Sequence, residues 1–208
     1  MTVYLGETAA LLAAAAGAFY GVWCIAARLG ARPPVGARPA WVDCIAMLVA
    51  AAVTLAWEIR ARRASATEIG FCAPRGGVRG AAISVGLSAA FVLYAIALFA
   101  LWRLRTPHML SVQSFGQVAA VLLCVAMTEE VVFRGILQRR LCAVCGAPFG
   151  IVISAIVFAL VAHAQAPMAM NLAFRLPAGL LLGYAYDRHR SLMAPIALHW
   201  ALNLAAVA

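Results

Sequence analysis

The sequence has little charge and contains no lysine. Charged residues make up 11% of the 208 residues, hydrophobic residues make up 66%, and the mean hydropathy is +0.96. A soluble domain carries about 25% charged and about 45–50% apolar residues. The composition therefore predicts an integral, multi-pass membrane protein. The net charge of +9 comes from arginine alone. Without a soluble basic domain, that charge is typical of loops beside anionic lipid head groups and not of nucleic-acid binding.

The chain also lacks the sequence signs of several enzyme and metal-site classes. It contains neither GxSxG nor HExxH, which would indicate a serine nucleophile or a zinc protease. Cys142 and Cys145 form a lone CxxC, and no second pair completes a zinc site. We therefore expect no cofactor and no metal. No basic segment precedes the first apolar run, so no cleavable signal peptide is expected. The arginine-only, alanine-rich composition indicates a bacterial source, and hence the bacterial cytoplasmic membrane.

Long apolar segments dominate the rest of the chain. A helix needs about 20 apolar residues to cross a membrane. We predict an all-α fold, a polytopic membrane helix bundle of about seven transmembrane helices. The first three spans belong to residues 1–110, which include a basic loop at 58–79, and the other four to residues 111–208. We expect both parts to form one structural unit. The predicted spans are 9–27, 40–57, 80–102, 115–141, 148–164, 168–186 and 191–208.

The fourth apolar segment contains an unusual cluster of charges, Glu129, Glu130 and Arg134. A charged side chain at the bilayer centre costs at least about 2.5–3.5 kcal/mol, so three within six residues indicate a function. Glu130 and Arg134 are four residues apart, so they can pair on one helix face. Glu129 points about 100° away from Glu130 around the helix and is left free for chemistry.

Polar residues in later spans complete a candidate site. His163 lies in the fifth span, Arg175 in the sixth, and His199 and Asn203 lie four residues apart in the seventh. Ionisable residues inside membranes usually face the bundle interior and pair there. One polar cavity between helices is therefore expected to hold the acidic motif and the polar residues of the fifth and seventh spans, namely Glu129, Glu130, Arg134, His163, His199 and Asn203. A carboxylate beside imidazoles can move a proton from water to a leaving group, and histidine and asparagine N–H groups can stabilise an oxyanion. The set indicates hydrolysis of an acyl bond.

Each of these residues also has a non-catalytic interpretation. Glu130 and Arg134 can form an ion pair that only braces the helix. Glu129 can belong to a satisfied polar network or to an ion path. A membrane histidine is often a hydrogen-bonded packing residue, and His199 with Asn203 can simply hold helices together. The order and spacing of the residues, rather than any one of them, favour the catalytic interpretation.

Two motifs resemble those of a known family. The segment from Glu129 to Arg134 resembles the EExxxR motif of the CPBP family, the Abi-type intramembrane glutamic endopeptidases that include CAAX proteases and bacteriocin-processing enzymes. The segment from His199 to Asn203 resembles the family's HxxxN motif. The resemblance covers about residues 118–203. The middle motif, FxxxH, is altered, because Phe158 lies five residues before His163 and Ala159 occupies the expected place.

The resemblance implies a role for each residue and makes residues 111–208 the CPBP-like catalytic core. Glu129 would activate the hydrolytic water and His163 would assist it. His199 and Asn203 would form the oxyanion hole, while Glu130 and Arg134 would shape the site. A cluster of Glu and His can bind zinc. Asparagine is a poor zinc ligand, however, so a metal-free glutamate mechanism is favoured.

The implied protein is an intramembrane endopeptidase. Its partners would be membrane lipids and a membrane-associated peptide or protein substrate, one with a C-terminal anchor or sorting signal if the chain is a sorting-linked bacterial member. No nucleic-acid partner is expected. Two alternatives remain: a non-catalytic immunity or scaffold protein with the same fold, and a proton-coupled transporter that uses Glu129 and His163 as a relay.

Overall fold

The structure is a computed structural model that describes residues 40–75, 77–102, 115–164 and 166–207. All secondary-structure elements in these ranges are helices, so the predicted all-α class is confirmed for this part of the chain. The elements are α2 (Ala40–Arg62), α3 (Ala66–Ile69), α4 (Gly77–Trp102), α5 (Phe115–Glu130), π-helix η2 (Val131–Gln138), α6 (Arg139–Cys145), α7 (Ala147–Ile156), π-helix η3 (Val157–Ala162), α8 (Met168–Met170), π-helix η4 (Asn171–Arg175), α9 (Leu176–His189) and α10 (Met193–Val207).

The predicted spans correspond to these helices, except for the span at 9–27, which lies outside the described residues. Within the predicted basic loop 58–79, α2 continues to Arg62 and α3 adds a short helix. By length and hydropathy, one helix among the described residues, Cys44–Arg62, could cross a membrane. The apolar helices Ala82–Leu98, Ala147–Ala162 and Met193–Ala206 are shorter. The number of membrane spans therefore stays a prediction.

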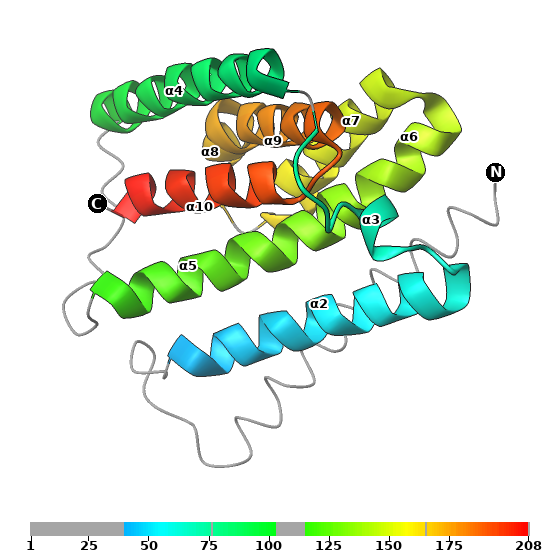
Figure 1. Cartoon of the computed structure of the whole chain (residues 1–208). Helices are drawn as coiled ribbons and strands as arrows, with labels where there is room; N and C mark the ends of the chain where they lie inside the picture. Colours follow the sequence, from blue (N-terminus) through cyan, green and yellow to red (C-terminus); the bar gives the residue numbers. More distant parts are fainter. Residues whose placement is uncertain (1–39, 76, 103–114, 165, 208) are drawn as a thin grey trace.

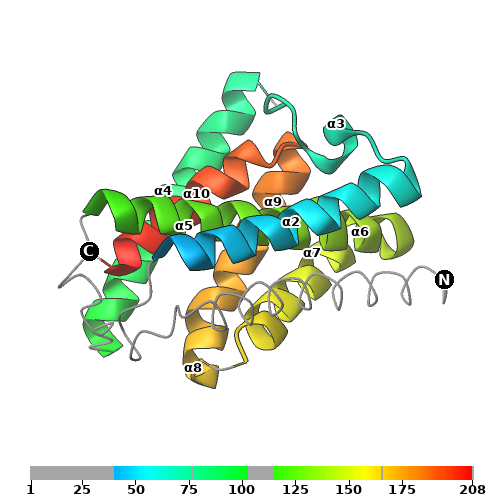
Figure 2. The ribbon, with the colours of Figure 1, turned by 90° about the horizontal axis from the view of Figure 1, so that it is seen from below.

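Helix α5 lies at the centre of the bundle. It packs between α2 and α10, and α9 packs in turn against α10, α7 and α4 (Figure 1). Seen from below, α7 and α9 run at a steep angle to α2 and α5 (Figure 2). This crossing brings the C-terminal half of the α5–η2 helix close to both α7 and α9. The residues after Met127 are therefore enclosed by helices on several sides.

Small residues allow this close approach. A Cβ atom on Gly179 would lie 3.1 Å from the Cβ atom of Ala155, and one on Gly183 would lie 2.7 Å from Oε1 of Gln138. Two side chains of η2 pack against these glycines and donate hydrogen bonds to their carbonyl groups. Arg134 donates to the Gly179 carbonyl at 3.2 Å, and Gln138 donates to the Gly183 carbonyl at 2.9 Å. The spacing of four residues on both helices thus sets the register of η2 on α9.

The segment between α2 and α4 is docked onto the bundle by Ile69, which is fully buried against Tyr186 and Leu192. Tyr186 donates a hydrogen bond to the Ile69 carbonyl at 2.8 Å. The helix α3 begins with a capping box in which Ser65 and Glu68 exchange hydrogen bonds. The Ser65 backbone N–H and then its hydroxyl hold the pKa of the exposed Glu68 carboxyl below its ordinary value.

A buried ion cluster ties α2 to α6. Glu58 is fully buried near the end of α2 and accepts from Arg139 at 2.8 Å and from Arg140. In the sequence, Glu58 is only the first residue of the predicted basic loop 58–79. The pairing shows instead that the last turn of α2 belongs to the bundle.

Candidate active site

The two acidic residues at the end of α5 have different surroundings. Glu130 is fully buried, and its Oε2 lies 3.2 Å from Nε of Arg134, one helical turn later. The ion pair predicted from the spacing is therefore confirmed. Glu129 lies on the neighbouring face of the helix, and its side chain is 24% exposed. The predicted division between a paired acid and an available acid agrees with this geometry.

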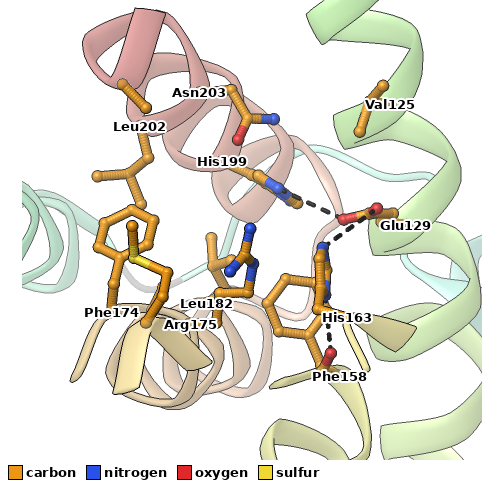
Figure 3. A pocket seen from close by; sticks show the side chains of 13 residues that line it. Val125, Glu129, Phe158, His163, Phe174, Arg175, Leu182, His199, Leu202 and Asn203 are labelled. Carbon is orange, nitrogen blue, oxygen red and sulfur yellow. Dashed lines mark hydrogen bonds and ion pairs between the residues drawn. The ribbon is translucent and has the colours of Figure 1, made fainter. Parts of the chain in front are cut away.

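Glu129 opens into a cavity of about 160 Å³. Its lining includes His163 from the turn after η3, Arg175 from the end of η4, and His199 and Asn203 from α10 (Figure 3). The structure thus brings Glu129 together with both histidines and Asn203, as expected from the sequence. Glu130 and Arg134 were expected to face the same cavity, but they do not line it, because both are fully buried in the helix packing. A liquid water occupies about 30 Å³, so the cavity can hold several waters or part of a peptide.

The two histidines flank the Glu129 carboxylate. Nε2 of His163 lies 4.0 Å from Oε1, and Nε2 of His199 lies 3.6 Å from Oε2. Both distances are long for a direct hydrogen bond and suit a bridging water. The other ring nitrogen of His163, Nδ1, lies 2.9 Å from the Phe158 carbonyl. A carbonyl only accepts, so Nδ1 carries the proton, and in the neutral ring Nε2 faces Glu129 as an acceptor.

His199 is held from behind by Glu130. Its Nδ1 lies 2.7 Å from Oε1 of Glu130, and both side chains are buried. Glu130 therefore contacts two groups, Arg134 and His199. The spacing in the sequence predicts the first contact, but the second was not predicted. No local pattern reveals it, because the two residues come from different helices.

In the family motif, the aromatic residue that packs on the histidine lies four residues before it, at position 159 of this chain. Here Phe158 packs on His163 instead. Phe158 and His163 are five residues apart, which matches the i to i+5 repeat of a π-helix, and they lie at the two ends of η3. Their rings meet edge to face at 4.9 Å. The Phe158 ring also lies 5.9 Å from the His199 ring and 4.7 Å from the Arg134 guanidinium carbon. The π-helix absorbs the extra residue and keeps Phe158 in contact with the site.

Arg175 and Asn171 form a second polar pair beside the histidines. Arg175 donates to Oδ1 of Asn171 at 3.1 Å, and Asn171 donates to the His163 carbonyl at 2.9 Å. Arg175 was a polar candidate in the sequence, whereas Asn171 was not predicted. Among the described residues, no group of three or more His, Cys, Asp or Glu side chains is arranged to hold a metal ion.

The comparison with protein families agrees with this geometry. Residues 111–205 match the family described as type II CAAX prenyl endopeptidase Rce1-like. The match covers slightly less than half of the chain and confirms the resemblance inferred from the motifs. The family consists of CAAX-type proteases that are integral membrane proteins. No curated protein and no solved structure matches the chain.

Proposed function

We propose that this protein is an intramembrane endopeptidase that hydrolyses a peptide bond with water activated by Glu129. One observation carries the proposal: in a cavity formed by a segment that matches a protease family, a partly exposed carboxylate faces Nε2 of two histidines, 3.6 Å and 4.0 Å away. A carboxylate in such surroundings can act as a general base. We place the site within a bundle of about seven membrane-spanning helices.

The first step is attack by water. A water between Glu129 and His163 gives a proton to the Glu129 carboxylate, and its oxygen forms a bond to the carbonyl carbon of the scissile peptide. Nε2 of His163 accepts the water's second hydrogen bond and fixes its orientation. The hydrogen bond from Nδ1 of His163 to the Phe158 carbonyl supports this role, because it leaves Nε2 as the acceptor.

The charge that develops on the carbonyl oxygen is stabilised by His199 and Asn203. Nε2 of His199 and the amide of Asn203 donate to this oxygen. Nδ1 of His199 already donates to Glu130, so donation from Nε2 requires the ring to be doubly protonated. The buried carboxylate of Glu130 holds Nδ1 of His199 at 2.7 Å and so fixes the orientation of the ring. Glu130 thus positions His199 and does not contact the substrate.

The second step breaks the peptide bond. The carbon–nitrogen bond cleaves, and Glu129 returns its proton to the leaving amine. The products are one chain with a new carboxyl group and one with a new amine, and Glu129 is again ionised. The second proton of the water stays on the new carboxyl group and then passes to the amine, which gives a carboxylate and an ammonium group. The sequence of steps consumes one water and needs only residues of this chain.

The substrate that fits this site is a membrane-associated peptide or protein. The described helices expose large apolar side chains, including Val85 and Leu93, each 68% exposed, which suit contact with lipid. We place the protein in a bacterial cytoplasmic membrane. Its substrate would then be a membrane-associated protein with a C-terminal anchor or sorting signal. The name of the matched family adds CAAX-type prenylated chains as a second class of substrate to test.

The test compares peptides released from membranes that contain the wild type, Glu129→Ala or His199→Ala. Mass spectrometry of these peptides should show fragments that need both residues, while immunoblots show equal amounts of each protein. Glu68→Ala, an exposed acid outside the cavity, serves as the matched control and should process like the wild type. Identical fragments from all four membranes would contradict the enzyme assignment and favour a scaffold or transport role. Cleavage that resists chelators would support the metal-free mechanism.

A further inference from the structure

The cavity contains a cation that the proposed hydrolysis does not use. The half-buried Arg175 lines the cavity, and its guanidinium points into it between Phe174 and His163 (Figure 3). Its hydrogen-bond partner is the neutral Asn171, at 3.1 Å. Among the residues that the structure describes, Arg175 forms no ion pair with a carboxylate. Arg134 differs, because Glu130 lies 3.2 Å from it.

Asn171 fixes this cation relative to the reacting groups. It is buried to 1% exposure and bridges Arg175 to the backbone carbonyl of His163. The guanidinium and His163 are therefore held by a common side chain. A long arginine side chain that is already positioned loses less conformational freedom when it binds a ligand.

The two acids near the cavity have other neighbours than Arg175. Glu130 pairs with Arg134, and the Glu129 carboxylate lies between the two histidines. Among the described residues, no carboxylate therefore lies within ion-pair distance of Arg175, and its guanidinium can bind one that enters the cavity. A guanidinium in a partly water-excluded cavity prefers a planar, two-oxygen anion, which a carboxylate provides.

We propose that Arg175 binds a carboxylate of the substrate close to the scissile bond and thereby selects which peptides are cleaved. The carboxylate can come from a free C-terminus shortly after the scissile bond or from an acidic side chain beside it, and the two sources present the same chemistry. This inference rests on the proposed function, because the peptide must occupy the cavity that Glu129 faces.

The experiment uses short lipid-anchored fluorogenic peptides with the full-length protein in liposomes. One parent sequence is synthesised with either a C-terminal carboxylate or a C-terminal amide. Each of these forms is made with either Asp or Asn beside the scissile bond. The proteins are the wild type, Arg175→Gln, Arg175→Lys and the control Arg188→Gln. Arg188 is exposed in the last turn of α9, the helix that follows Arg175, so its replacement removes an equal charge away from the cavity.

The expected result is a selective loss. The wild type should cleave the peptides with the relevant carboxylate roughly tenfold to hundredfold faster in kcat/KM than their neutral forms, as a charge-assisted hydrogen bond provides. Arg175→Gln should remove that preference, Arg175→Lys should keep part of it, and Arg188→Gln should keep all of it. The preferred pair of peptides identifies the source of the carboxylate.

Two results would overturn the inference: a wild type that does not distinguish acidic from neutral peptides, or an Arg175→Gln variant that loses the same factor on all of them. Binding of the same peptides to Glu129→Gln separates this inference from the proposed function. Tighter binding of the acidic peptides that depends on Arg175, without cleavage by the wild type, would support the carboxylate site and contradict the protease. Cleavage by the wild type without any preference for acidic peptides would support the protease and contradict the carboxylate site.

Discussion

Replacing Glu130 with Gln should strongly destabilise the protein. The substitution keeps an oxygen that can accept from Nδ1 of His199, but it removes the charge 3.2 Å from Arg134. Arg134 and Glu130 are both fully buried, so water cannot replace the lost partner. Breaking a buried ion pair by removing one member costs about 3–5 kcal/mol. For a chain of this size about 1 kcal/mol shifts Tm by about 2–4 °C, so Tm should fall by about 6–20 °C.

The measurement is thermal unfolding of purified protein in detergent, followed by circular dichroism. Asp187→Asn is the matched control, because Asp187 pairs with Arg190 at 3.0 Å on the surface, where Arg190 is 60% exposed. An exposed pair contributes about 0–1 kcal/mol, so Tm should change by less than about 4 °C. Equal shifts in the two variants would refute the view that burial makes the Glu130 pair important.

Three further predictions concern other parts of the bundle. Phe158→Leu should lower kcat for peptide cleavage more than it lowers Tm, because the ring contacts both His163 and His199; unchanged kcat would contradict a positioning role. Glu58→Gln should lower Tm by about 6–20 °C, since the buried carboxylate faces Arg139 and Arg140; a Tm equal to that of the wild type would contradict this. The ionised Glu68 carboxylate stabilises the cap that it forms with Ser65, which is why the pKa of Glu68 lies below its ordinary value of 4.5 in the folded protein. This stabilisation is fully present above pH 4.5 and is lost as the pH falls through the lower pKa of the folded state. Limited proteolysis at residues 63–75 should therefore increase under acid, and Glu68→Gln should remove that pH dependence.

Features that depend on residues close together in the sequence could be predicted, and they include much of the helical architecture. Continuous apolar runs place the helices within a few residues of their observed ends, because helix formation in apolar segments satisfies the backbone hydrogen bonds locally. The spacing of Glu130 and Arg134 predicts their ion pair for the same reason. The cost of isolated charge in an apolar environment explains why Glu129, His163 and His199 meet in one cavity.

Contacts between distant segments were not predictable from the sequence. Glu58 and Arg139 are 81 residues apart, and nothing near Glu58 distinguishes a buried acid from a loop acid. The hydrogen bond between Glu130 and His199 spans 69 residues and depends on how α10 packs against α5. Paired basic residues after an apolar helix are a weak sign that a buried acid faces them, and they could have suggested the Glu58 cluster.

The spacing of Phe158 and His163 shows a different limit. Read as an α-helix, five residues place the two side chains on different faces, and Ala159 takes the position of the aromatic partner. The π-helix changes the repeat, so Phe158 regains that position. A π-helix depends on the surrounding packing and has no reliable pattern in a single sequence. The departure from the family motif was itself the available sign.

The most direct measurement is the rate constant for cleavage of one bound peptide by the wild type and by Glu129→Gln in liposomes, with stability and peptide affinity measured for both. A general base contributes about 10²–10⁴-fold, so Glu129→Gln should cleave at least about a hundredfold more slowly while unfolding and binding stay near wild-type values. A folded, peptide-binding Glu129→Gln protein that cleaves within a few-fold of the wild-type rate would contradict the account.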